Sequence, residues 1–271
     1  GAYALSADTK GNRSVAIGGS SLYTQNFTTS TNTFNTAVGH GTGYAITTGI
    51  YNTLIGGNAG TALIDADNNV ALGVSALTAD TYGSSSVAIG YSALATQNFT
   101  TATDSYNTAV GHNSGTAVTT GTSNTLIGGL AGDAVQTGSY STAVGRGSLS
   151  AACSDHNTAV GYASLNAATG TNSTAVGSNA GYGVTSGDNN LILGKDAGRT
   201  GSPGGNITTG DNEIALGDEN ITEANIQVDW TIASDERDKT DFTALDLGLD
   251  FVKALAPVTY KWDKRSKYID K

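Results

Sequence analysis

The side chains that could do chemistry in this chain are few, and most of them stand alone. The histidines are His40, His112 and His156, and the single cysteine is Cys153. His40 and His112 each follow a glycine and occupy equivalent positions in two copies of one recurring stretch. In a symmetric assembly, equivalent copies of these histidines could face one another and bind an ion. A solvated turn side chain explains each of them without an ion, and we expect that simpler role.

Acidic pairs and glycine-rich runs offer a second kind of chemistry. Asp65 with Asp67, and Asp218 with Glu219, have the residue types of glycosidase carboxylates or calcium ligands, but exposed turn acids explain them more simply. The runs GGNAG (56–60) and GSPGG (201–205) have no helix predicted after them, so a phosphate-binding loop is not expected. Cys153 has no disulfide partner, and we expect a small core or surface residue. We predict no metal and no cofactor.

Composition narrows the function classes. The chain has 271 residues, of which 37 are glycine, and only 13% are charged and 38% hydrophobic. Its formal net charge is −10, and the acidic excess lies before Ser234, which argues against a nucleic-acid-binding face. A charge-poor, glycine-rich chain is also unlike a disordered polar tract. No apolar run approaches the roughly 18 residues of a membrane helix, so we expect no membrane insertion.

A short motif ending in glycine recurs along most of the chain. Any functional side chains in this part of the chain must therefore be held by the structure that these repeats form. Its spacing is nearly constant, with longer steps before Gly39, Gly111 and Gly217. The stretch 35–57 returns at 107–129 with few changes, so a block of four repeats is duplicated. Self-similarity at a short period is typical of a solenoid. The twelve motifs end at Gly18, Gly39, Gly56, Gly73, Gly90, Gly111, Gly128, Gly145, Gly161, Gly177, Gly194 and Gly217.

Each motif is predicted to be a short strand that ends in a glycine turn. The residue before the glycine is always Ile, Val or Leu, and the one before that is Ala in nine repeats. Alternate strand residues face opposite sides, so both faces are apolar and both should be covered. We expect Ile17, Val38, Ile55, Leu72 and their equivalents to stack inward in one column. The alanine face would then need a partner, which two further copies of the chain could supply.

These repeats predict an all-β fold, a parallel β-solenoid of about twelve coils and roughly 58 Å in length. A monomeric solenoid with small residues on its surface is the alternative to a homotrimer. The composition changes near Ala233, which marks a boundary. We therefore divide the chain into a repeat domain (1–217), a connecting stem (218–233) and a C-terminal part (234–271).

The repeats resemble known surface proteins. Two motifs are similar to the head repeats of trimeric autotransporter adhesins and to related phage tail-fibre segments. One is NTAVG followed by AG, TTG and NT, and the other is SVAIGYSALA. The resemblance covers roughly residues 12 to 217. It implies a left-handed parallel β-roll in an intertwined trimer, and it is shared by bacterial and viral proteins.

The C-terminal part resembles a second family. Its motifs are similar to the start of the S74 peptidase domain, the intramolecular chaperone of endosialidases and tail fibres. They are Ser234-Asp235-x-Arg237-x-Lys239, followed by LGLDFV, AL, PV and YKW. Apolar spacing predicts a helix over 245–255, which ends before Pro257, and alternation predicts a strand over 258–262. The C-terminal part would thus be a short α+β extension.

The S74 resemblance implies one covalent reaction. It assigns Ser234 and Lys239 as a catalytic dyad, with the bond between Ser234 and Asp235 as the cleavage site. A lysine that is partly desolvated can accept the serine proton, which makes the hydroxyl a nucleophile. From the residues alone, SDER could instead be a capped turn with Lys239 in solvent. We expect the chain to hold only the start of such a domain, so that this single-turnover autoprotease is inactive here, and we expect no enzyme for an external substrate.

Together these features predict a host-recognition segment of a phage tail fibre or spike, located in the virion. Its partners would be two further copies of itself and a glycan or protein of the host surface. One alternative is the head of a bacterial trimeric adhesin on the cell surface. Another is an ice-binding solenoid, because Thr36, Thr53, Thr108 and Thr125 could form a stacked array, although one threonine per strand and irregular coil lengths weigh against it.

Overall fold

The structure is a computed structural model that describes residues 1–227. The chain divides into two compact units, Gly1–Glu223 and Ala224–Lys271. The first unit contains all of the repeats. The expected helix over 245–255 and strand over 258–262 lie outside the described residues.

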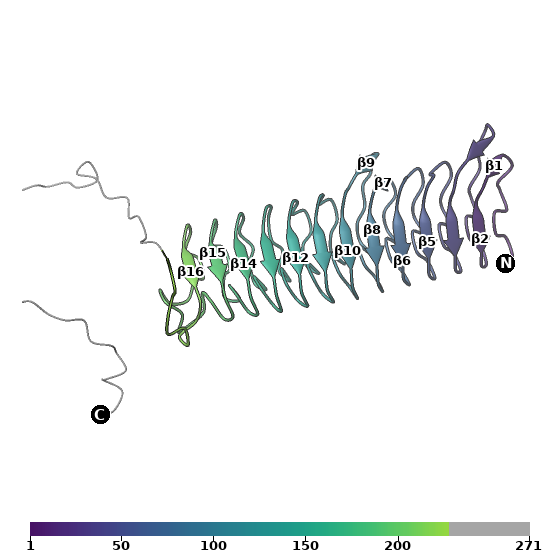
Figure 1. The fold of residues 1–271 in the computed structure, drawn as a ribbon. Coiled ribbons are helices and arrows are strands. Elements are labelled where there is room, and N and C mark those ends of the chain that lie inside the picture. The colour runs from purple at the N-terminus through teal and green to yellow at the C-terminus, as the bar shows by residue number, and fades with distance from the viewer. Residues whose placement is uncertain (228–271) are drawn as a thin grey trace, which may run out of the picture. The chain divides into compact units, whose positions relative to one another are not determined.

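The first unit is a parallel β-solenoid, which confirms the predicted fold class (Figure 1). One short strand from each repeat joins a single sheet of twelve strands, whose order follows the chain from β2 to β16. Neighbouring strands pair in parallel and in register, so that Ala37 lies beside Leu54, and Leu54 beside Ala71. The sheet consists of β2 Val15–Ile17, β4 Thr36–Val38, β5 Thr53–Ile55, β6 Val70–Leu72, β8 Val87–Ile89, β10 Thr108–Val110, β11 Thr125–Ile127, β12 Thr142–Val144, β13 Thr158–Val160, β14 Thr174–Val176, β15 Leu191–Leu193 and β16 Ile214–Leu216.

Two further pairs of strands mark longer coils. β1 (Gly11–Asn12) pairs with β3 (Thr31–Asn32), and β7 (Gly83–Ser84) pairs with β9 (Thr103–Asp104). The second strand of each pair, β3 or β9, lies in the long step before Gly39 or Gly111, and the first strand lies in the preceding coil, so each copy of the duplicated block carries one pair.

The two longer coils are packed in the same way. The amide nitrogen of the buried Gln97 donates to the buried Asp80 carboxylate at 2.6 Å. In the first copy, Gln25 donates to Asp8 through the same atoms. The inserted residues therefore have a structural role that is repeated with the block.

The orientation of the strands differs from the prediction. The middle residue of each strand, mostly alanine, faces the interior of the coil and is buried in eleven strands, whereas the aliphatic residue before the glycine faces outward. Ile17 is 58% exposed and Leu72 is 45% exposed. The expected inward column is therefore wrong: alanine fits the narrow interior of the coil, where larger side chains from the opposite wall, such as Leu77 and Leu94, fill the remaining space. The alanine face needs no partner, because its own coil covers it.

The glycine after each strand is required by its conformation and by the next coil. Gly111 has φ +142°, a region that side chains rarely adopt. A Cβ atom built there would lie 2.5 Å from the carbonyl oxygen of Gly128 in the next coil. The close stacking of coils at this turn excludes every residue except glycine.

The Asn or Ser at the start of ten of the twelve motifs forms a buried ladder along the rod. The side-chain oxygen of Asn124 accepts the backbone N–H of Ser141 at 2.9 Å, and its amide nitrogen donates to the carbonyl of Gly138 at 2.8 Å. The backbone N–H of Asn124 in turn donates to the side-chain oxygen of Asn107. Nine of the ten rungs accept a backbone N–H of the following coil that would otherwise be buried without a partner. The hydroxyl of the tenth, Ser86, contacts the side chains of Gln97 and Ser105 instead. The buried residues in this position are Asn35, Asn52, Asn69, Ser86, Asn107, Asn124, Ser141, Asn157, Ser173 and Asn190.

Candidate functional site

The candidate site is a pocket formed where the repeat is interrupted. The step from Gly194 to Gly217 is the longest between two motifs, and its insertion forms a loop that contains Pro203. The pocket has a volume of about 410 Å³ and is lined by residues of three successive turns, from Tyr182 to Asn220. None of its lining residues belongs to a strand of the sheet.

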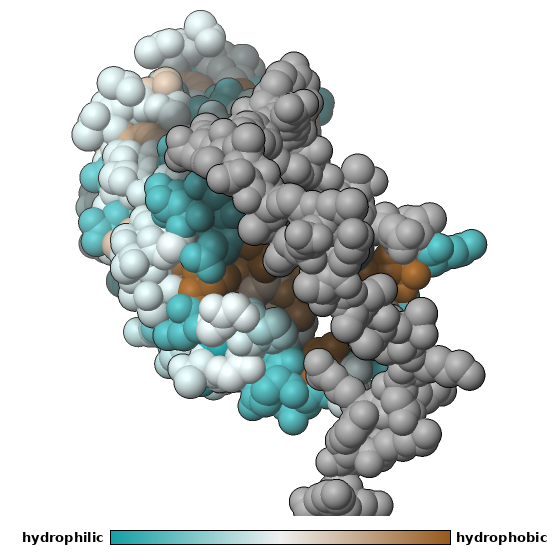
Figure 2. All heavy atoms as spheres, turned by 90° about the vertical axis from the view of Figure 1, so that its left-hand side faces the viewer, coloured by the Kyte–Doolittle hydropathy of each residue, from teal (hydrophilic) through white to brown (hydrophobic). Residues whose placement is uncertain are grey.

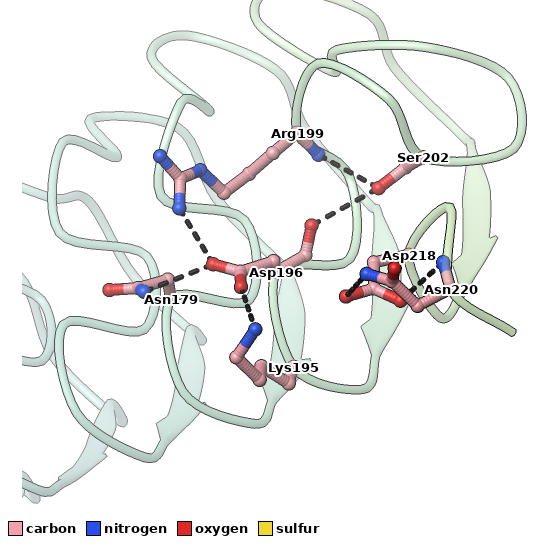
Figure 3. Close-up of polar contacts among 7 residues, drawn as sticks. All are labelled: Asn179, Lys195, Asp196, Arg199, Ser202, Asp218 and Asn220. Atoms are coloured by element: carbon pink, nitrogen blue, oxygen red, sulfur yellow. Dashed lines mark hydrogen bonds and ion pairs between the residues drawn. The ribbon is translucent and has the colours of Figure 1, made fainter.

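Asp196 is the central charge of this pocket (Figure 3). One carboxylate oxygen lies 2.6 Å from Nζ of Lys195, and the other accepts from the Arg199 guanidinium at 2.6 Å. The side-chain amide of Asn179 donates to the second oxygen at 3.0 Å. Lys195, Asn179 and Arg199 lower the pKa of Asp196 to about 2, and Asp196 raises the pKa of Lys195.

Arg199 and Ser202 connect the insertion to the preceding coil. The guanidinium of Arg199 lies over the ring of Tyr182, 5.3 Å from its centre. The Ser202 hydroxyl accepts the backbone N–H of Arg199 at 3.2 Å and donates to the carbonyl oxygen of Asp196 at 3.1 Å. These contacts hold the wall of the pocket in place.

The far side of the pocket is acidic. Asp218 accepts both the backbone N–H and the side-chain amide of Asn220, at 3.0 and 3.1 Å, and these hydrogen bonds lower its pKa. Glu219 also lines the pocket. The sequence predicts both Asp218 and Glu219 to be exposed turn acids, which is correct for Glu219 but wrong for Asp218, which is only 8% exposed. The structure places both of them in one pocket with Lys195 and Asp196.

The remaining sequence candidates do not converge on a site. Asp65 accepts from the Thr48 hydroxyl and Asp67 from the Ile50 backbone, both at 2.7 Å, and burial raises the pKa of Asp67. His112 stacks on Tyr91, and His156 on Tyr140. Within residues 1–227, no three His, Cys, Asp or Glu residues are grouped as metal ligands.

Cys153 is a packed core residue. It is 3% exposed and belongs to the hydrophobic cluster inside the coils. Burial raises the pKa of its thiol to about 11, so the thiolate form is scarce near neutral pH. The interpretation of Cys153 as structural is consistent with this position.

The outward column is the second surface of interest. It consists of Ile17, Val38, Ile55, Leu72, Ile89, Val110, Ile127, Val144, Val160, Val176, Leu193 and Leu216, aligned by the parallel register along the whole sheet. Viewed toward the β16 end of the rod, Figure 2 shows hydrophobic residues exposed beside hydrophilic ones. Contiguous apolar surface of this kind marks an interaction site more often than isolated exposed residues do.

The residues of the predicted dyad, Ser234 and Lys239, and the cleavage site at Ser234–Asp235 lie outside the described residues. Within residues 1–227 no helix has the length and hydropathy of a membrane span.

The pocket is not predicted by the sequence. The GSPGG run and the acidic pair are visible as motifs, but nothing in the sequence links either of them to Lys195, Asp196 and Arg199. The sequence feature that could have indicated the pocket is the step between Gly194 and Gly217, which is the longest between two motifs.

Comparison with known proteins supports the C-terminal resemblance. Residues 234–271 match the family model Peptidase_S74, described as the chaperone of endosialidase. No curated protein and no solved structure matches the chain. The family match therefore concerns the C-terminal part, and the solenoid stands on its own geometry.

Proposed function

We propose that this chain is a rod-forming segment of a phage tail fibre or spike, that it assembles as a homotrimer, and that it contacts a glycan or protein of the host surface. The observation that carries the proposal is the outward column, twelve aliphatic residues that run the length of a rod whose chain continues into the chaperone-like residues 234–271. The chaperone match favours a phage protein over the head of a bacterial adhesin.

The outward column gives a physical reason for trimerisation. Fully burying a valine or leucine side chain contributes roughly 1.5–3 kcal/mol relative to leaving it in water. Repeated in register on every coil, even partial burial would outweigh the cost of associating three chains. Three rods around one axis would bury the three columns against one another. The trimer interface is thus proposed on the aliphatic residues, and the alanines remain inside each coil.

Light scattering of the purified chain tests this proposal. The expected mass is three times the 27.2 kDa of one chain, independent of concentration in the micromolar range. A mass of one chain at every concentration would contradict the trimer and leave the outward column without a partner.

The S74 match supports a maturation step. We propose that a Ser234 hydroxyl attacks the carbonyl carbon of the peptide bond between Ser234 and Asp235 while Lys239 accepts the hydroxyl proton. In a trimer the hydroxyl can come from a neighbouring copy, which avoids the four-membered ring that attack on its own carbonyl would require. The amine of Asp235 leaves with a proton, and water then hydrolyses the ester, so the chain is cut once.

Variants of the dyad test this step in a chain that is joined to a complete domain of this family. Ser234→Ala and Lys239→Ala should each remain uncut on a denaturing gel and should still form trimers, because assembly precedes cleavage. Cleavage of the Ser234→Ala variant at the same bond would overturn the assignment.

The threonine array supports a second candidate, an ice-binding surface. Seven strands of the twelve-stranded sheet begin with threonine, and their first and third residues face the same side of the sheet, so the threonines flank the outward column. A trimer built on this face would cover the array, so the two functions exclude one another. Thermal hysteresis of a monomeric sample would favour ice binding, and its absence in a trimeric sample would favour the fibre.

A further inference from the structure

We infer that the pocket of the long coil binds a neutral saccharide unit, and that it is the place where the rod contacts a host glycan. The inference deepens the proposed host attachment and rests on it. It begins from a single departure from the repeat. The shorter steps suffice to build a coil, and the extra residues before Gly217 add nothing to the sheet, whose strands β15 and β16 still pair in register.

An insertion on a rigid solenoid is a usual way to add a binding surface to a repeat. The two other insertions, before Gly39 and Gly111, are copies of one another, and each adds a strand that pairs with the preceding coil, which indicates a structural role. The last insertion occurs once within the described repeats and forms one wall of the pocket.

The lining favours a hydroxyl-rich ligand. The pocket is lined by both donors and acceptors: the amides of Asn206 and Asn220, the carboxylates of Asp218 and Glu219, and the Tyr182 phenol. A sugar hydroxyl donates one hydrogen bond and accepts others, so it matches a wall on which both kinds of group lie side by side. An apolar ligand would displace water from these groups without replacing the hydrogen bonds that the water makes.

The charge balance favours a neutral ligand over an anion. Two cations, Lys195 and Arg199, face three carboxylates, those of Asp196, Asp218 and Glu219. Both cations already contact Asp196 at 2.6 Å. An added phosphate or carboxylate would compete with Asp196 for them and would meet the other two carboxylates, which repel it.

The pocket wall is also held in place before a ligand arrives. Asp196 is fixed by three side chains, and Ser202 bonds the insertion to the backbone of Asp196 and Arg199 (Figure 3). Side chains that are already ordered lose little further entropy on binding. The exposed Tyr182 ring adds an amphipathic surface at the edge of the pocket.

Saturation-transfer NMR with defined glycosides tests the inference. The probes are the methyl glycosides of glucose, galactose, mannose and N-acetylglucosamine, with methyl glucuronide as the anionic comparison. We expect the ring protons of at least one neutral glycoside to be saturated by the wild-type chain, and those of methyl glucuronide to be saturated more weakly. Tyr182→Ala and Asn206→Ala should each weaken binding of the neutral glycoside about tenfold, which corresponds to about 1.4 kcal/mol.

The chain provides a matched control in Tyr162→Ala. Tyr162 is also exposed and also lies under an arginine, with Arg146 6.0 Å from the ring centre, but its coil has no insertion. This variant should bind like the wild type, and all variants should retain the circular dichroism of the wild-type chain. Any of three results would overturn the inference: none of the four neutral glycosides binds, methyl glucuronide binds better than they do, or both pocket variants bind like the wild type. A trimeric mass in the same samples would leave the proposed fibre intact, so the two failures are distinguishable.

Discussion

At the residue scale, the buried asparagines hold successive coils together. Asn124 is fully buried, and its side chain is the hydrogen-bond partner of one backbone N–H and one backbone carbonyl in the next coil. Leaving a buried group unpaired costs about 1–3 kcal/mol. Asn124→Ala leaves two such groups unpaired and should therefore lower the free energy of unfolding by roughly 2–6 kcal/mol, as measured by chemical denaturation.

Asn98 provides the control for this prediction. It is exposed, and its side chain only accepts from the Thr81 hydroxyl. Asn98→Ala should change stability by less than about 0.5 kcal/mol, as surface substitutions usually do. Equal losses in the two variants would show that the ladder contributes nothing beyond ordinary surface contacts.

Asp196 gives a second prediction at this scale, which concerns pH. Its folded-state pKa is about 2, below the ordinary value of 3.8, mainly because Lys195 pairs with it. Since the pKa is depressed, the contribution of Asp196 to stability is present above pH 4 and is lost as the pH falls toward 2. A carboxyl-carbon NMR titration should give a midpoint near 2, and Lys195→Gln should raise it toward 3.8. An unchanged midpoint in Lys195→Gln would show that the ion pair does not form in solution.

At the element scale, the turn after each strand decides which glycines are replaceable. Gly111 and Gly57 both lie in the turn region, but only Gly111 has a positive φ and a backbone atom where a Cβ would stand. Gly57 has no atom within 4 Å of that position. Gly111→Ala should therefore lower the free energy of unfolding by several kcal/mol. Gly57→Ala should be neutral or raise it by about 0.4–1 kcal/mol, because alanine reduces the conformational entropy of the unfolded chain. Thermal unfolding compares the pair, and a harmless Gly111→Ala would mean that the coils are not stacked as closely as described.

At the scale of the whole molecule, adjacent residues of one strand should separate folding from assembly. Ala109 faces the interior of the coil and is fully buried, whereas Val110 belongs to the outward column. Ala109→Asp should cost several kcal/mol, because it buries an unpaired charge inside the coil. Val110→Asp should leave the single chain folded but place three carboxylates together at the proposed trimer axis.

Light scattering and circular dichroism separate the two outcomes. Val110→Asp should keep the strand spectrum and shift the mass toward the 27.2 kDa of one chain. Ala109→Asp should lose the spectrum itself. A trimeric and fully stable Val110→Asp variant would place the association surface somewhere other than the outward column.

Much of the fold was predictable because it depends on local spacing. The recurring glycines located all twelve strands of the main sheet, and the long steps in the duplicated block contain one strand of each extra pair. A glycine turn and a short strand are specified within one repeat, and near-identical repeats stack in register.

The tertiary structure alone decided which side of each strand faces inward and where the pocket lies. Alternation in a motif such as TAV defines two faces, but here both faces are apolar, and only the width of the finished coil assigns alanine to the inside. The pocket likewise combines Tyr182, Asp196 and Asp218, which belong to successive turns and meet only because the coils stack. The long step before Gly217 marked the place in the sequence, but the packing of the inserted loop against its neighbours determined which side chains face one another.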